Sequence, residues 1–186
     1  MNTAQILKDA EERMAKAEEV LRNELRGLRT GRASPALLDA IRVDYYGSAT
    51  PIKQLAQVSA PEPQQLVIRP FDVGALKDIE KAIRSSDIGL SPNNDGKVIR
   101  LQIPSMSGEQ RKKMSAHIKK LAEEAKVACR NIRRDANKAF ETAEKNKTMT
   151  EDERDQGKDK VQNLLKTHED KLQDLADKKT KEVMED

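Results

Sequence analysis

The feature that most constrains this chain is a stripe of apolar residues, at steps of three and four, in its C-terminal half. The stripe begins after Pro104, where Ser107 and Gln110 match a capping box, and it runs to about Lys145. It consists of Met114, Ile118, Leu121, Ala125, Ala128, Ile132, Ala136 and Ala139. Such a segment makes about eleven helical turns, which is too long for a lone globular helix, so it needs partner helices along its apolar face.

The N-terminal segment repeats this pattern. Its apolar face consists of Leu7, Ala10, Met14, Ala17, Leu21, Leu25 and Leu28. The spacing predicts a helix of roughly 27 residues that ends at "RTGRASP" (29–35). There Gly31 can take the left-handed conformation of a helix C-terminus, and Pro35 cannot extend the helix.

A third helix is predicted from Thr150, with Glu153 as its capping-box partner. Its apolar seam continues through Val161, Leu165, His168, Leu172, Leu175 and Val183. Three long amphipathic helices of this kind predict an antiparallel three-helix bundle.

The segment between the first two helices has a different pattern. Alternating apolar and polar residues predict strands in "IRVDYY" (41–46), "QLVIRPF" (65–71) and "KVIRLQI" (97–103). A helix is predicted in "ALKDIEKAIR" (75–84) and a turn in "SPNNDG" (91–96). We therefore expect an α+β protein, mainly helical, in which a small β/α/β domain is inserted into the bundle.

The predicted boundaries give a bundle of residues 1–30 and 105–186 and an insert of residues 31–104. Because the insert enters and leaves between the same two helices, both crossings lie at one end of the bundle. We expect these crossings, near 30–34 and 103–106, to act as a hinge. The hinge residues are Thr30, Gly31, Arg32, Ala33, Ser34, Pro104 and Ser105.

Composition narrows the possible functions. Aromatic residues make up 2% and charged residues 36% of the chain, so the core consists mainly of aliphatic side chains. The single cysteine, Cys129, excludes an internal disulfide, and with two histidines it provides no metal-binding spacing. No apolar run approaches the ~20 residues of a membrane span, and the N-terminus is acidic too early for a transit peptide. We expect a cytoplasmic protein without a metal or another cofactor.

Positive charge is concentrated in one segment. Residues 107–149 hold twelve basic and six acidic side chains, whereas residues 150–186 hold eight basic and twelve acidic ones. This asymmetry indicates an anionic partner for the first of the two segments.

On a helical wheel, the basic side chains form a ridge that points away from the apolar stripe. The predicted RNA-binding residues are Arg130, Asn131, Arg133, Arg134, Asn137, Lys112, Lys119 and Lys126, together with Arg29, which belongs to a basic stripe beside the apolar face of the first helix. Guanidinium groups bind phosphate through paired hydrogen bonds, and Asn both donates to and accepts from base or sugar edges. Because Phe140 is the only aromatic residue nearby, we expect recognition of RNA shape and phosphates rather than stacking of single-stranded bases.

Other interpretations remain open at this point. The ridge could simply solvate the outside of a bundle, with one arginine paired to Asp135. The helices could instead form a coiled-coil scaffold or a chaperone adaptor that binds proteins. An enzyme is disfavoured, because the sequence has no phosphate-binding glycine loop and no converging set of titratable groups. Cys129 and His168 are expected to be packing residues at the edge of the core.

Four blocks together resemble one family, the bacterial ribosome recycling factors. They are "LRTGRASPALLD" (28–39), "VDYYG" (43–47), "DIGLSPNNDG" (87–96) and "VACRNIRRDAN" (127–137). Their order and spacing match over the whole chain. Cys129 stands where this motif often has a small aliphatic residue, and it preserves the size.

The resemblance implies an L-shaped molecule whose bundle binds the rRNA of the large ribosomal subunit. With elongation factor G and GTP, such a protein splits the post-termination ribosome and releases it from mRNA at the end of protein synthesis. The resemblance also implies that activity depends on Arg133, that Arg130 is a neighbouring RNA contact, and that the smaller domain meets elongation factor G. We accordingly expect a monomer that is not an enzyme and has no membrane or DNA partner.

Overall fold

The computed structural model describes residues 2–185, which fall into two compact units. We call residues 1–25 and 112–186 the helical unit and residues 26–111 the mixed unit. The mixed unit thus extends beyond the predicted insert at both ends. The predicted L-shaped outline stays a prediction.

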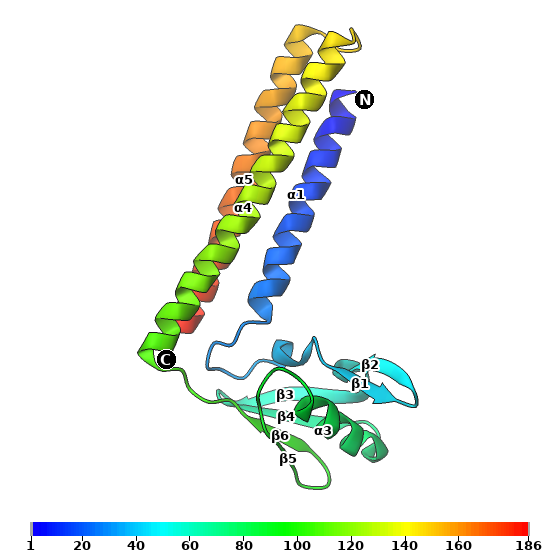
Figure 1. Cartoon of the computed structure of the whole chain (residues 1–186), viewed down its shortest axis with the longest axis vertical. Coiled ribbons are helices and arrows are strands. Elements are labelled where there is room, and N and C mark those ends of the chain that lie inside the picture. The colour runs from blue at the N-terminus through cyan, green and yellow to red at the C-terminus, as the bar shows by residue number, and fades with distance from the viewer. Residues whose placement is uncertain (1, 186) are drawn as a thin grey trace. The chain divides into compact units, whose positions relative to one another are not determined.

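The helical unit is a bundle of three long helices (Figure 1). These are α1 (Thr3–Arg26), α4 (Gly108–Lys145) and α5 (Glu151–Met184). Helix α4 runs antiparallel to both α1 and α5 (Figure 1), which confirms the predicted bundle. Among the described residues, no helix combines the length and the apolar character that a membrane span requires.

Local side-chain chemistry sets where the two longest helices begin. The Ser107 N–H donates to Gln110 Oε1 at 2.9 Å, and the Gln110 N–H donates back to Ser107 Oγ at 3.2 Å. Thr150 and Glu153 form the second capping box in the same way. Both boxes were predicted, because a capping box depends only on residues three apart.

The end of α1 was predicted wrongly. The helix stops at Arg26, before Gly27, a residue with weak helix propensity. Gly31 does adopt a left-handed conformation, with φ of +79°, but it lies beyond the helix. A Cβ at Gly31 would lie 3.3 Å from the Met106 backbone nitrogen, so the small residue allows a close approach of two segments of the mixed unit.

The core of the bundle differs from the predicted stripe in α4. Cys129, expected at the edge of the core, is fully buried, as is Phe140. Ala128, expected inside, is exposed. Alanine is small enough to fit either face of a helix, so its spacing alone does not locate the core, whereas a phenyl ring needs buried volume. The buried face of α4 is therefore rotated, by about 45° on a wheel of 100° per residue, toward Cys129 and Phe140.

The mixed unit contains two antiparallel sheets, and its elements are labelled in Figure 1. The first sheet pairs β1 (Arg42–Tyr45) with β2 (Ser48–Pro51). The second has the order β3-β4-β6-β5 and contains β3 (Ala56–Glu62), β4 (Gln65–Pro70), β5 (Pro92–Asn94) and β6 (Ile99–Gln102). The helices are α2 (Ile52–Leu55) and α3 (Leu76–Arg84), with short 3-10 turns η1 (Pro35–Leu38) and η2 (Val73–Ala75).

The predicted strands and helix of the insert are present as β1, β4, β6 and α3, which confirms the small β/α/β domain. The strands β2, β3 and β5 were missed. β3 and β5 are the edges of their sheet and both contain proline, and β3 is mostly exposed, so neither shows the alternating pattern of a half-buried strand. The predicted turn at 91–96 consequently begins with a strand.

The core of the mixed unit lies between α3 and the larger sheet. Leu76, Ile79 and Ile83 of α3 are buried, as their spacing predicted, in one cluster with Leu66 and Ile68 of β4. The cluster is almost wholly aliphatic, which agrees with the low aromatic content of the chain. This packing gives the mixed unit a core of its own.

Candidate nucleic-acid interface along α4 and α5

The predicted ridge lies beside the seam between α4 and α5. The prediction that it points away from the core is wrong for Lys126, Arg130, Arg133 and Asn137, which are all partly buried. The rotation of the buried face toward Cys129 carries this side of α4 up against α5. The ridge therefore forms one wall of an interhelical seam.

Three ridge residues reach across the seam to side chains of α5. Lys126 Nζ donates to Gln173 Oε1 at 2.6 Å. Arg130 Nε donates to Glu169 Oε1 at 2.7 Å, and Arg133 Nη1 donates to Gln162 Oε1 at 3.0 Å. As the residue number rises on α4 it falls on α5, as expected for antiparallel helices. These contacts hold the three cations at defined positions along the seam.

Arg130 is the ridge residue that is most strongly paired. Besides Glu169, its guanidinium contacts Glu123 Oε1 at 3.0 Å, and the hydrogen bonds that it donates to Glu169 and then to Glu123 raise its pKa. The side chain is nevertheless 41% exposed. Exposed ion pairs contribute only about 0–1 kcal/mol each, so phosphate oxygens could replace these carboxylates at little cost.

Arg133 keeps its charge unpaired by any carboxylate of the described residues. Among the described residues, its one hydrogen-bond partner is the neutral amide oxygen of Gln162, and its Nε is buried without a partner there. One helical turn further on, the buried Asn137 Oδ1 also has no hydrogen-bond partner within residues 2–185. A buried polar atom left unsatisfied costs about 1–3 kcal/mol, and such atoms are rare in native proteins.

The remaining ridge residues are open to solvent. Lys112, Lys119, Asn131 and Arg134 are exposed, and none of the three cations forms an ion pair with another described residue. Their positive charges are therefore available to an anionic ligand. Among the ridge cations, Arg130 alone pairs with carboxylates of the described residues.

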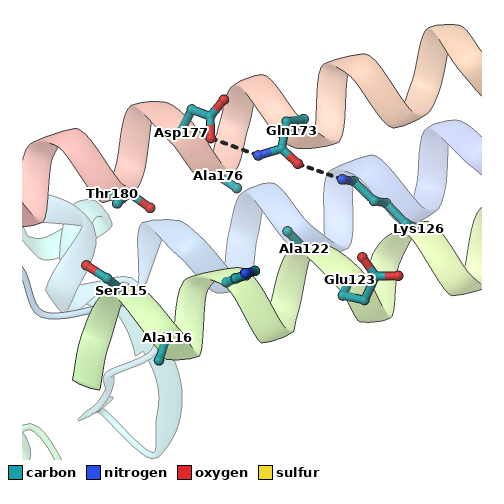
Figure 2. A pocket seen from close by; sticks show the side chains of 10 residues that line it. Ser115, Ala116, Ala122, Glu123, Lys126, Gln173, Ala176, Asp177 and Thr180 are labelled. Carbon is teal, nitrogen blue, oxygen red and sulfur yellow. Dashed lines mark hydrogen bonds between the residues drawn. The ribbon is translucent and has the colours of Figure 1, made fainter. Parts of the chain in front are cut away.

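A shallow groove follows the seam toward the beginning of α4 (Figure 2). Small side chains line much of it, among them Ala122 and Ala176. Lys126 stands at its edge, where Gln173 accepts a hydrogen bond from the ammonium group and donates another to Asp177 at 2.8 Å. Because small side chains line this groove, Lys119 and Lys126, which also line it, can lie close to a bulky partner.

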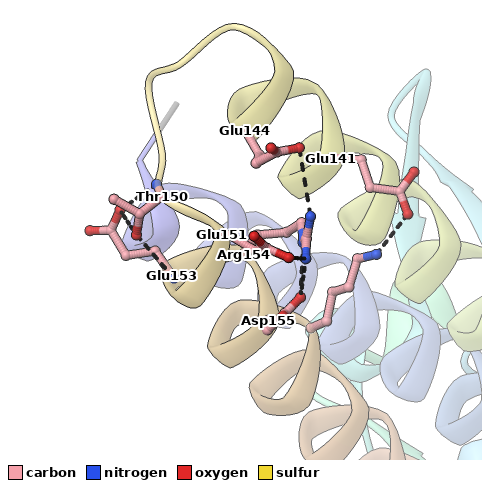
Figure 3. A network of polar contacts seen from close by, with 8 residues as sticks. Glu141, Glu144, Thr150, Glu151, Glu153, Arg154 and Asp155 are labelled. Carbon is pink, nitrogen blue, oxygen red and sulfur yellow. Dashed lines mark hydrogen bonds and ion pairs between the residues drawn. The ribbon is translucent and has the colours of Figure 1, made fainter.

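The acidic start of α5 does not form a metal site. Arg154 lies at its centre and contacts Asp155 at 2.8 Å, Glu151 at 3.2 Å and Glu144 of α4 at 3.6 Å (Figure 3). Asp155 foremost, and then Glu151, raise the pKa of Arg154. The network ties the two helices together beside their connecting turn. No group of residues within 2–185 has the composition of a metal site.

The residues set aside from the sequence are packing residues. Burial raises the pKa of the Cys129 thiol to about 11, so it is a poor nucleophile. His168 is buried, with Nδ1 3.4 Å from Glu18 of α1. Phe140 is fully buried and cannot stack on a base. Asp135 pairs with Arg13 of α1 at 2.8 Å, which links two helices of the bundle.

The structure places Arg29 in the mixed unit and not on α4. It is exposed, and its guanidinium lies next to Gly89, where a Cβ would come within 3.3 Å of Nη2. Its role in RNA binding stays a prediction.

The predicted hinge residues have different surroundings. Thr30 is buried, the Ala33 N–H donates to the Pro63 carbonyl at 2.6 Å, and Ser34 caps η1. Arg32 is partly buried. Pro104 and Ser105, by contrast, are exposed. The stretch 30–34 is thus anchored in the mixed unit, and the hinge itself stays a prediction.

The α5 residues in the seam could not be predicted from the sequence. Gln162, Glu169 and Gln173 carry no motif, and Glu123 looks like any surface carboxylate. Their spacing of seven and four residues is compatible with one face of a helix, but only packing shows that this face meets the ridge.

The chain was compared with known proteins. The family model described as ribosome recycling factor matches residues 21–184. A ribosome-recycling factor from Rhodopirellula baltica is 64% identical over 139 residues, which cover 75% of each chain. One from Symbiobacterium thermophilum is 49% identical over 183 residues, or 98% of this chain and 99% of the relative.

Two solved structures extend this similarity to the fold. The solution structure of a ribosome recycling factor superposes with a TM-score of 0.82 at 41% identity, over 99% of this chain and 98% of the other. A second structure contains the T. thermophilus ribosome recycling factor with E. coli elongation factor G on the E. coli post-termination complex. It has a TM-score of 0.71 at 40% identity and covers 100% of both chains. Sequence and fold agree over essentially the whole length, and the chain belongs to the ribosome recycling factor family.

Proposed function

We propose that this protein, together with elongation factor G and GTP, splits the post-termination ribosome into subunits and releases it from mRNA. The observation that carries the proposal is the ridge of cations on α4. The fold that holds this ridge is that of a family whose members are named for ribosome recycling. A relative of 40% identity is described with elongation factor G on the post-termination complex, which supports the same partners here. The protein is a translation factor rather than an enzyme, and we place it in the cytoplasm.

The ridge binds the folded rRNA of the large subunit. Lys112, Lys119, Lys126 and Arg133 recur every seven residues, so their Cα atoms follow one another at about 10.5 Å along a stiff helix. The seam contacts with α5 reduce the side-chain entropy that Lys126, Arg130 and Arg133 would otherwise lose on binding. RNA phosphates then replace the carboxylates that pair with Arg130. At Arg133 they bind the guanidinium beside its neutral partner, the Gln162 amide.

Motion between the two units couples the GTPase to the ribosome. Because residues 30–34 are anchored in the mixed unit, we place the bending just outside them, at residues 27–29 and 104–107. Elongation factor G pushes on the mixed unit, and the stiff bundle transmits the push to the contacts between ribosomal subunits. The protein itself makes and breaks no covalent bond, since the energy comes from GTP on its partner.

The alternative of a protein-binding scaffold receives less support. Such a scaffold needs an apolar strip along its helices. Within the described part of the helical unit, the large exposed apolar residues are Val20, Val127 and Met184, one on each helix. Single exposed apolar residues are ordinary on a protein surface.

A binding experiment with large ribosomal subunits tests the ridge. If it makes about five phosphate contacts, log affinity falls against log salt with a slope of about −3.5 to −4.5. The Arg133→Ala variant should lose about 1.5–3 kcal/mol of binding free energy, the range for hydrogen bonds to charged groups. The matched control is Lys138→Ala, which removes an exposed cation from another side of α4 and should change affinity less than about twofold. Salt-independent binding, or equal effects of the two variants, would reject the ridge as the interface.

A further inference from the structure

Two buried polar atoms of the ridge without hydrogen-bond partners lie one helical turn apart. They are Arg133 Nε, which carries one N–H donor, and Asn137 Oδ1, which is an acceptor. Among residues 2–185 five buried side-chain atoms lack a partner, and these are the only two that belong to residues four apart. Because such atoms are rare in native proteins, an unpaired donor next to an unpaired acceptor indicates a complementary pair and not two separate defects.

The geometry of α4 brings the two side chains together. The Cβ atoms of residues four apart on a helix are separated by about 5–6 Å. Helical side chains lean toward the N-terminus of their helix, so Asn137 leans over the turn that carries Arg133. The last torsion of an asparagine side chain is soft. A small rotation of the Asn137 amide, or one bridging water, therefore joins Oδ1 to the Arg133 Nε–H.

A contact at Nε would fix the orientation of the Arg133 guanidinium. Its Nη1 donates to Gln162 Oε1 at 3.0 Å, and this is its one hydrogen bond to a described residue. A planar group held at one point can still rotate about that bond, whereas a second contact fixes its plane. With Nε turned into the seam, the two terminal nitrogens are presented outward. They form the fork that binds a phosphate through paired hydrogen bonds.

The partners of Arg133 differ in charge from those of its neighbour Arg130. Arg130 is held by two carboxylates, which compete with a phosphate for its guanidinium. At Arg133 the acceptors are the neutral amides of Gln162 and, one turn away, Asn137. A neutral acceptor restricts the side chain, and so lowers the entropy lost on binding, but leaves the positive charge of the guanidinium uncompensated.

We propose that Asn137 is a positioning residue, whose amide oxygen accepts the Arg133 Nε–H, directly or through one water, and so holds the guanidinium fork toward an RNA phosphate. This inference rests on the proposed function, in which the ridge binds rRNA. It gives Asn137 a role different from the predicted one, a direct contact with RNA. The burial of Oδ1 in the seam favours the positioning role, because a buried acceptor does not reach a base or sugar edge.

Four variants separate the two roles of Asn137. Asn137→Leu removes the acceptor at nearly constant size, and Asn137→Ala removes it without adding a branched side chain, so a misfit of leucine would show as a difference between them. Arg133→Lys keeps the positive charge but has no Nε–H. Asn163→Leu makes the same replacement at an exposed asparagine of α5 and is the matched control.

The first measurement needs only the free protein. NMR of protein with ¹⁵N-labelled arginine follows the exchange of the Arg133 Nε–H with solvent. Because a hydrogen bond slows this exchange, we expect it to be at least about fivefold faster in Asn137→Leu and Asn137→Ala than in the wild type. The Asn163→Leu variant should exchange at the wild-type rate.

The second measurement is a double-mutant cycle of binding to large ribosomal subunits. Asn137→Leu and Arg133→Lys should each weaken binding about five- to tenfold, and the double variant should be within about twofold of Arg133→Lys alone. In Asn137→Leu the slope of log affinity against log salt should become shallower by about 0.7–0.9, because one phosphate contact is lost although no charge has been removed.

The opposite results overturn the inference. Unchanged exchange of the Nε–H in both Asn137 variants shows that the hydrogen bond does not exist. A loss of affinity from Asn137→Leu that is equally large in the Arg133→Lys background shows that Asn137 contacts RNA itself or supports the fold. A loss with an unchanged salt slope shows that the lost contact is not one to phosphate. If the exchange rates change as expected but the wild type binds large subunits without salt dependence, the proposed function fails and the hydrogen bond stands.

Discussion

Gly157, in the second turn of α5, offers a sharp test of how the bundle is packed. A glycine inside a helix costs about 1 kcal/mol relative to alanine, so Gly157→Ala should stabilise the protein if only helix propensity mattered. In the structure, however, a Cβ at this position would lie 2.5, 2.7 and 2.9 Å from Cε1, Cζ and Cδ1 of Phe140. These distances are about 1 Å shorter than an ordinary carbon–carbon contact.

The clash cannot be relieved cheaply, because Phe140 is fully buried in the bundle. Overpacking a well-filled core costs about 1–3 kcal/mol, which exceeds or matches the propensity gain. We expect Gly157→Ala to lower the free energy of unfolding by up to about 2 kcal/mol, which is the overpacking cost less the propensity gain. In a Phe140→Leu background the ring edge is absent, and the same change should instead stabilise the protein by up to about 1 kcal/mol.

The assay is urea unfolding of the four proteins of this double-mutant cycle, followed by circular dichroism at 222 nm. The expected result is a change of sign between the two backgrounds and a coupling energy of about 2 kcal/mol. In a chain of this size, 1 kcal/mol corresponds to about 2–4 °C in the unfolding temperature, so a thermal scan checks the direction. A Gly157→Ala variant that is stabilised equally in both backgrounds would refute the packing explanation.

Three further predictions concern charge and capping. The Val98 N–H and neighbouring groups lower the pKa of Asp95 to about 2. The contribution of Asp95 to stability is therefore present above its unfolded pKa and is lost as the pH falls from about 4 to 2. The Asp95→Asn variant should flatten this part of a plot of the urea midpoint against pH. Glu123→Gln removes one of the carboxylates that pair with Arg130. Binding to large subunits should therefore tighten by up to about fivefold at low salt and be unchanged at high salt. Weaker binding would contradict the exchange of carboxylate for phosphate at Arg130. Thr150→Ala removes the cap of α5 and should cost about 1 kcal/mol in urea unfolding, whereas Thr150→Ser should cost little.

Much of the fold could be predicted because it depends on local interactions. The 3.6-residue period places the three long helices, and capping boxes at Ser107 and Thr150 place the starts of two of them within one residue. Alternation in β4 and β6 reveals the two central strands, which bury one face against α3. The edge strands β3 and β5 lack this signal, because an edge strand needs no continuous apolar face.

The candidate site was only partly predictable. The cluster of Arg130, Arg133 and Arg134 is visible as charge in the sequence. Their surroundings are not visible, because the partners of each side chain lie on other elements. Nothing local shows that Arg130 faces Glu169.

By itself, the sequence determined the helices, the aliphatic cores and the concentration of positive charge on α4, since each follows from composition and from spacing along one element. Only the tertiary structure decided which side of α4 meets α5. Alanine and cysteine are small enough for either side, and the Phe140 ring, seated against Gly157, sets the rotation. That rotation moves the ridge from the outside of the bundle to the seam, where α5 holds its cations in place.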